Sequence, residues 1–464
     1  MSQIHKKVKE KLDDVGCGFC LAKWTQVTLH LQNGHTHSCH HPDTHKIPLD
    51  ELKNNPSALH NTKFKKLRRK EMLEGDRPKE CDYCWNIEDN SDKFSDRIFK
   101  SADSWSLPSY KKIKKLDWKE NFNPRYVEVL FSNACNQKCS YCSPNISSTW
   151  MEEIKVHGGY PTSSQFNDLE NLAKVGKMPI PHREYNPYVE AFWEWWPELY
   201  RDLHTFRITG GEPLLSKDTF KVLDYIIEEK NPNTNLNLAV NSNLTVPDDL
   251  IDEFIDKVNY ITTNNLVKTF VCFTSTDTWG EQAEYIRNGM GSFEKFWSNC
   301  DKVLSKCEKV NLTFMCTYNA LSVPNFDKLI TEIYKLKCKH WSGDRYYGNA
   351  IVLDISYLRH PPHQNVKILP KKWGRNIKKQ AQFMDFLSKK GIGVDSYYKA
   401  FTDVEVDKMK RIYDWFISDI SHSELMRNRK DFYIFFSEHD KRRKTDFGSV
   451  FPELLEFYRE CKNA

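Results

Sequence analysis

Hydrophobic and polar residues alternate along residues 125–371 in two patterns, one typical of buried strands and the other of amphipathic helices. Six short apolar segments predict strands, at 126–131, 206–209, 236–240, 270–275, 310–317 and 351–357. Helical patterns lie between them, and Ser216 and Ser292 stand where helix N-caps would. Strand–helix alternation predicts an α/β fold with a parallel sheet and helices outside it. We therefore expect a partial (β/α)6 barrel, open on one side, with its active site at the carboxyl ends of the strands.

The pattern changes on both sides of this barrel, at 125–371. Residues 1–100 form a small domain rich in cysteine and histidine, and residues 101–124, polar and basic with two prolines, predict a linker. Residues 372–464 predict a helical region, within which 433–436 fits a strand or a buried helix. No apolar stretch is long enough to span a membrane, and no hydrophobic leader precedes the first domain. We expect a cytoplasmic protein with no membrane partner.

Net charge and cysteine content narrow the range of functions that the chain could have. The net charge of +5 is small for 464 residues, so a nucleic-acid partner is not expected. Short basic runs at 63–70, 111–115 and 441–444 are interpreted as solvated helix faces and loops. Of the 14 cysteines, eight lie before residue 143 at close spacing, which indicates metal or iron–sulfur ligation in a reducing compartment. The later cysteines are interpreted as small buried hydrophobic residues.

Three cysteines follow the first predicted strand of the barrel at the spacing C-x3-C-x2-C: Cys135, Cys139 and Cys142. Three thiolates can hold three irons of a four-iron cluster and leave the fourth iron without a protein ligand. A cofactor or substrate can chelate that open iron. A structural zinc loop is the alternative, but zinc would need a fourth ligand nearby, and none follows closely.

This loop, with Tyr141 before its last cysteine and a GGEP turn at 210–213, resembles the radical SAM superfamily. The resemblance implies that the open iron binds S-adenosylmethionine (SAM). Reductive cleavage of SAM then gives a 5′-deoxyadenosyl radical that abstracts hydrogen from a substrate. A flavodoxin or ferredoxin is the implied reductant.

The same resemblance implies contacts with SAM, for which the candidates are Tyr141, Gly210, Gly211, Glu212, Ser242, Ser275 and Arg287. The glycines would let the backbone approach the methionine amino group closely. Ser242, at the end of the third predicted strand, would reach the carboxylate or ribose. Ser275 and Asp277, at the end of the fourth, would reach the ribose. Arg287 would pair with the carboxylate, and an exposed salt bridge is its other interpretation. No residue is singled out as a catalytic acid or base.

Two close cysteine pairs and a central cysteine in the first domain predict one shared metal centre. Cys17, Cys20, Cys81 and Cys84 have the paired form of a zinc ribbon. Alternatively, a second, fully ligated [4Fe–4S] cluster is held by Cys20, Cys39, Cys81 and Cys84. The six nearby histidines are interpreted as surface loop residues: His30, His35, His37, His40, His41 and His45.

The second cysteine set resembles the twitch auxiliary domain, a shortened SPASM domain. The resemblance rests on Cys20 with Trp24 four residues later, on the turn at Gly34, and on Trp85 after the C-x2-C pair. The C-terminal segment resembles the end of phage-encoded twitch-containing radical SAM proteins, which would place the chain in a host cytoplasm.

These resemblances imply a radical SAM enzyme that modifies a peptide or protein. Full ligation of the second cluster favours an electron-transfer role. An RNA or small-metabolite substrate is the alternative within this chemistry. A non-catalytic iron–sulfur or zinc protein is the alternative outside it.

Overall fold

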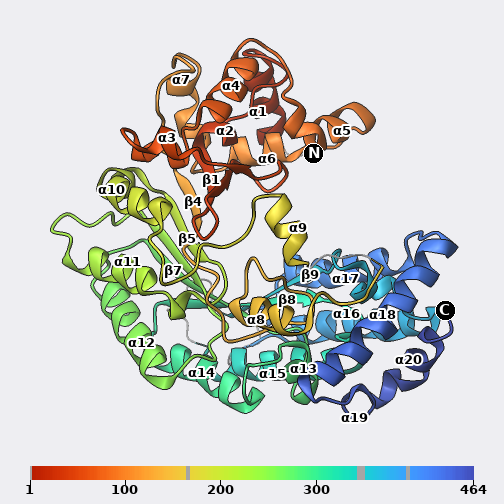
Figure 1. The fold of residues 1–464 in the computed structure, drawn as a ribbon. Helices are drawn as coiled ribbons and strands as arrows, with labels where there is room; N and C mark the ends of the chain where they lie inside the picture. The colour runs from red at the N-terminus through yellow and green to blue at the C-terminus, as the bar shows by residue number, and fades with distance from the viewer. Residues whose placement is uncertain (1–2, 164–167, 342–350, 393–397) are drawn as a thin grey trace.

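A nine-stranded sheet, in the order β3-β2-β1-β4-β5-β6-β7-β8-β9, forms the centre of the protein (Figure 1). The computed structural model describes residues 3–163, 168–341, 351–392 and 398–464. The strands are β1 (Gln26–His30), β2 (His35–His37), β3 (His45–Lys46), β4 (Tyr126–Leu130), β5 (Thr205–Thr209), β6 (Asn237–Asn241), β7 (Thr269–Ser275), β8 (Val310–Tyr318) and β9 (Ile351–Tyr357).

The strands from β4 to β9 are the six that the sequence predicts, and they run parallel in chain order, as expected. Their side chains alternate between two environments. Val127, Phe206 and Leu238 pair in register and are fully buried in the main core with the helices. The next residues along β4 and β5, Glu128 and Arg207, point to the opposite face and are partly accessible. We call this opposite face of β4–β9 the inner face of the sheet.

Helices cover the outside of the sheet, as the predicted α/β fold requires (Figure 1). Ser292 caps one of them by accepting the backbone N–H of Lys295, whereas Ser216 occupies an N-cap position without a side-chain bond. The barrel helices are α8 (Ser148–His157), α9 (Leu169–Lys174), α10 (Pro187–Asp202), α11 (Lys217–Glu228), α12 (Asp248–Thr263), α13 (Glu281–Ile286), α14 (Phe293–Lys306) and α15 (Phe326–Lys339).

The N-terminal region is joined to the barrel sheet, because β1 pairs in parallel with β4 along its whole length. This covers the open edge of β4. The expected linker at 101–124 is packed structure instead: Ile113 and Phe122 are buried in a small second core with Trp24. The helices here are α1 (Gln3–Asp13), α2 (Ala22–Thr25), α3 (Leu49–Leu52), α4 (Lys63–Leu73), α5 (Asp82–Asn90), α6 (Asp96–Ala102) and α7 (Tyr110–Ile113).

The C-terminal region is helical, as predicted, and packs beside β9 (Figure 1). The segment at 433–436 lies within a helix and supplies Phe435 and Phe436 to the core. None of the described helices combines the length and the apolar character needed to cross a membrane. The helices are α16 (Gly374–Lys390), α17 (Asp403–Ile417), α18 (His422–Arg443), α19 (Phe447–Val450) and α20 (Leu455–Cys461).

Candidate functional site

The loop that carries the first three cysteines connects β4 to α8 at the carboxyl end of the sheet. It is fixed from two sides. The backbone N–H of Cys135 donates to the Ser148 hydroxyl at 3.1 Å, which ties the loop to α8. The backbone N–H of Ser140 donates to the Ile286 carbonyl at 2.7 Å, which ties it to the end of α13. The three thiols therefore project from one rigid loop.

The environment of these thiols fits thiolate ligands. Cys139 is 9% exposed, and Cys135 and Cys142 are half-buried. Burial raises the pKa of the Cys142 thiol to about 12, with a further contribution from Cys139. A bound metal reverses such a shift, because its positive charge stabilises the thiolate. Two donors already face the sulfurs: the Gln137 N–H lies 3.4 Å from Sγ of Cys135, and the Arg287 guanidinium 3.6 Å from Sγ of Cys139.

The GGEP turn packs directly on the cysteine loop. A Cβ atom on Gly211 would lie 2.3 Å from the Ala134 carbonyl oxygen, and Gly210 has a φ of +131° that favours glycine. The backbone N–H of Glu212 donates to the same Ala134 carbonyl at 2.7 Å. The glycines thus permit close approach of two loops. Their contact with SAM stays a prediction.

We expect Gly211→Val to cost the protein its core iron, because the new side chain would collide with two backbone oxygens, of Ala134 at 2.3 Å and Ile146 at 2.8 Å. Backbone cannot turn away as a side chain can, so a destabilisation of about 1–3 kcal/mol or more should accompany the loss. Iron content and thermal unfolding after anaerobic reconstitution measure both effects. Gly159→Val is the matched control, since nothing lies within 4 Å of its added Cβ. Equal iron in both variants would refute the contact.

Glu212 and Ser242, two of the predicted SAM contacts, have partners within the protein. The Glu212 carboxylate is 1% exposed and accepts hydrogen bonds from the Ser242 hydroxyl at 2.8 Å, the Asn243 N–H at 2.6 Å and the Leu214 N–H at 3.0 Å. Burial raises the pKa of Glu212 to about 7, against the lowering effect of these bonds. These hydrogen bonds join the GGEP turn to the end of β6.

Tyr141 and Arg287 meet at a buried carboxylate, Asp277. The Tyr141 hydroxyl donates to Oδ2 of Asp277 at 2.8 Å, and the Arg287 guanidinium donates to the Tyr141 oxygen at 2.6 Å. Nε of Arg287 lies 3.0 Å from Oδ2 of Asp277. Arg287 is only 6% exposed, so the interpretation of an exposed salt bridge is wrong. The ion pair is buried beneath the cysteine loop. Ser275, by contrast, is partly accessible at the end of β7.

Sequence reasoning missed Arg443, which α18 delivers to the cysteine loop. Its side chain is fully buried, donates to the Lys138 carbonyl at 2.6 Å and pairs with Glu153 at 3.0 Å. The interpretation of the run at 441–444 as solvated is therefore wrong at this residue. The available signal was the apolar repeat on the same helix, which indicates that α18 packs on the barrel.

The structure brings together Cys20, Cys39, Cys81 and Cys84, which line one enclosed cavity between α2, the end of β2, and α5. Each of these thiols has a raised pKa, with burial as the main cause and the neighbouring cysteines contributing. Cys17 lies elsewhere: it is exposed, and its thiol donates to the Gly75 carbonyl at 3.4 Å. The alternative ligand set that contains Cys17 is not brought together.

Cations outnumber acids around this cavity. Lys23, Arg97 and Lys100 line it together with the cysteines, and Asp96 is the one acid among the described lining residues. Lys23 is 3% exposed, forms an ion pair with Glu80, and lies close enough to Cys81 to lower the pKa of that thiol against the larger effect of burial. Such an environment favours an anionic occupant.

Two further buried cations, Lys65 and Arg69, lie near Lys23 without a direct ion pair to a described carboxylate. Lys65 and Arg69, on α4, are 1% and 0% exposed, so the interpretation of the run at 63–70 as solvated is wrong for them. Lys65 donates to the Thr36 hydroxyl at 2.9 Å and Arg69 to the Asn61 side-chain carbonyl at 2.8 Å. Neither forms an ion pair with any described carboxylate. A buried charge is costly unless it is paired.

The surface interpretation of the histidines holds for His40, which is exposed, and is wrong for His35, which is 4% exposed. The other four are partly accessible: His30, His37, His41 and His45. His30 and His37 face each other with their Nε2 atoms 3.1 Å apart. Burial lowers the pKa of His30 to about 3 and that of His37 to about 4, so both rings are neutral at pH 7.

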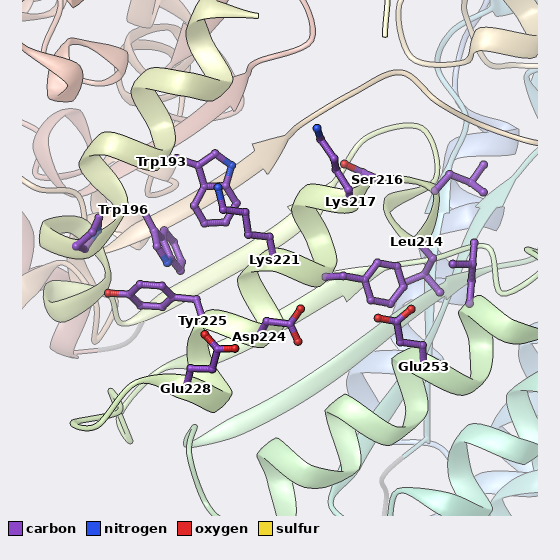
Figure 2. Close-up of a pocket in the computed structure, with 14 residues that line it drawn as sticks. Trp193, Trp196, Leu214, Ser216, Lys217, Lys221, Asp224, Tyr225, Glu228 and Glu253 are labelled. Carbon is purple, nitrogen blue, oxygen red and sulfur yellow. The ribbon is translucent and has the colours of Figure 1, made fainter. Parts of the chain in front are cut away.

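A groove of about 720 Å³ lies on the outer helical layer, between α10, α11 and α12 (Figure 2). Trp193, Trp196 and Tyr225 form one side of it, and Nζ of Lys221 lies 3.9 Å from the ring centre of Trp193. No cysteine is among the described residues that line the groove. Because it is on the outside of the sheet, it is separate from the cysteine loop and from the inner face.

Residues 129–330 match the family model described as the Radical SAM superfamily. The matched segment begins in β4, includes the cysteine loop and the GGEP turn, and ends in α15. No curated protein matches the chain. The chain therefore carries a radical SAM domain, and the family implies an enzyme with a [4Fe–4S] cluster and bound SAM. The match does not reach the first domain, where the second cysteine set lies.

Proposed function

We propose that this chain, whose radical SAM domain spans residues 129–330, modifies a peptide or protein and holds a second [4Fe–4S] cluster on Cys20, Cys39, Cys81 and Cys84. When bound, the core cluster and SAM supply one-electron cleavage and a hydrogen-abstracting radical. The observation that carries the second cluster is the single cavity that these four cysteines line. A flavodoxin or ferredoxin in the cytoplasm is the proposed reductant.

The cations around the cavity support the same proposal. Four thiolates on a four-iron or zinc centre leave a net negative charge, which Lys23, Lys65 and Arg69 would balance. Without such an occupant, Glu80, which pairs with Lys23, is the one carboxylate known to act on Lys65 among the described residues. The cation cluster therefore argues that the cysteines bind metal as thiolates.

The position of the site favours electron transfer as its role. Ligation by four cysteines leaves no iron open to a substrate, so electron transfer is the chemistry that such a cluster can supply. His37, two residues before Cys39, pairs with Thr28 on β1, and Thr28 pairs with Glu128 on β4. The second cysteine set therefore follows a strand that lies two positions from β4 in the sheet.

A peptide or protein substrate is supported by the resemblance to twitch and SPASM domains rather than by a bound molecule. The buried cations give a reason to disfavour RNA. Several residues of the basic runs, such as Lys65, Arg69 and Arg443, are inside the protein and cannot contribute to a surface stripe.

Metal analysis of the wild type and of Cys84→Ala tests the proposal. We expect about eight irons and eight sulfides per wild-type chain, without zinc, and about four irons in the variant. Cys17→Ala is the matched control and should keep all eight, because Cys17 is outside the cavity. Zinc in the wild type, or an undiminished iron content in Cys84→Ala, would overturn the second cluster. Release of 5′-deoxyadenosine tests the radical chemistry separately.

A further inference from the structure

Two opposite charges lie side by side on the inner face of the sheet without pairing. Glu128 on β4 and Arg207 on β5 are partners in parallel register, and both are partly accessible. Neighbouring strands are about 4.8 Å apart, close enough for such side chains to meet. Yet neither residue forms an ion pair with any charged side chain that the structure describes.

Arg207 has neutral partners on the next three strands. Its Nε donates to Oδ1 of Asn241 on β6 at 2.9 Å, and one terminal nitrogen lies 3.4 Å from Sδ of Met315 on β8. Its guanidinium carbon lies 4.3 Å from the ring centre of Phe273 on β7. These contacts fix the plane of the guanidinium and give it no negative charge. An arginine held in this way is preorganised for an anion.

Glu128 has a neutral partner on β5, the strand that carries Arg207. Its Oε1 accepts a weak hydrogen bond from the Thr209 hydroxyl at 3.4 Å. Thr209 is the last residue of β5, immediately before the GGEP turn. The separated charges are therefore about two residues along the strands from the carboxyl end, where the cysteine loop lies.

We propose that Arg207 binds a carboxylate of the substrate on the inner face, with Glu128 accepting a hydrogen bond from an N–H group beside that carboxylate. The inference rests on the proposed function only for the substrate class: in a peptide, the carboxylate is an acidic side chain or the chain end. Asn241 and Phe273 orient the guanidinium for a two-point contact, which carboxylates accept and carboxamides do not.

The test uses isosteric pairs of small probes with the reconstituted full chain. N-acetylglutamate α-amide is compared with N-acetylglutamine α-amide, and N-acetylalanine with its amide. Charge-assisted hydrogen bonds should make the carboxylate of at least one pair bind about ten- to a hundredfold more tightly. Arg207→Met should remove this preference, and Arg207→Gln, which can still bond Asn241, guards against a folding defect. Arg375→Met, on the exposed side of α16, should keep it.

A wild type that shows no preference for either carboxylate would overturn the proposal, as would an Arg207→Gln variant that retains the preference. Failure here is distinguishable from failure of the proposed function. Eight irons and release of 5′-deoxyadenosine without any preference for a carboxylate would refute only the carboxylate site. A preference for a carboxylate without SAM cleavage would refute only the proposed enzyme activity.

Discussion

Replacing Cys139 by alanine is expected to reduce 5′-deoxyadenosine release to the level of protein-free controls. Cys139 is the most buried of the three core cysteines, at 9% exposure, and its sulfur has the Arg287 guanidinium 3.6 Å away. Its loss leaves two thiolates for a cluster that needs three, so the cluster should not persist. Anaerobic reconstitution followed by chromatography of the SAM reaction measures the effect, and the iron content should fall by about half.

Two comparisons make this result specific. Cys338→Ala removes an exposed cysteine on α15, outside both cysteine sets, and should keep full iron and activity. Cys84→Ala should lose a similar amount of iron but still release 5′-deoxyadenosine, because the core loop is intact. SAM cleavage by Cys139→Ala would show that the core assignment is wrong.

The barrel was predictable from the sequence because its signals are local. Strand β9 lies at the predicted residues, and β4 and β7 differ from the predictions by one residue at one end. Each strand of a parallel sheet is covered by helices on one face, which places apolar residues at a fixed spacing. The cysteine loop was equally evident, since all three ligands occur within eight residues, 135–142.

What could not be predicted depends on contacts between distant segments. Nothing in the segment at 26–30 indicates that it pairs with β4, about a hundred residues later. Lys65, Arg69 and Met72 share one face of α4, and charge alone assigned that face to solvent. The face is buried because it packs on the second core behind Lys23. The same reasoning applies to the glycine turn: its sequence indicated a tight turn, but only the fold shows that Gly211 abuts Ala134.

Lys65→Met is expected to stabilise the metal-free protein by about 1–4 kcal/mol at pH 7, the range found when buried charges are replaced by hydrophobic residues. In the metal-free protein, burial lowers the pKa of Lys65 well below its usual value, and the nearby Arg69 and Lys23 lower it further. His60 accepts a bond from Lys65 at 3.3 Å but carries no negative charge when neutral. The wild type therefore carries the cost of a buried ammonium group or of its deprotonation.

The lowered pKa of Lys65 determines whether the free energy of unfolding rises or falls with pH. The unfolded chain keeps a proton on Lys65 up to about pH 10.4. The folded, metal-free chain loses it at lower pH, so folding releases a proton and stability rises with pH between the two pKa values, by at most about 1.4 kcal/mol per pH unit. Lys65→Met should flatten this rise. Lys63→Met, an exposed position on the same helix, should leave it unchanged.

Metal loading should abolish the stabilisation by Lys65→Met, which would link the buried cations to the cysteines. The negative charge of the Cys39 thiolate raises the pKa of Lys65. In the metal-loaded protein, Lys65 would therefore keep its ammonium form, stabilised by the charge of the metal–thiolate centre. Lys65→Met should then stabilise the metal-free protein but not the loaded one. Chelator-treated and reconstituted samples, unfolded in denaturant side by side, measure the difference. Equal stabilisation in both states would show that Lys65 does not balance a metal–thiolate charge, and that the buried cations serve the fold alone.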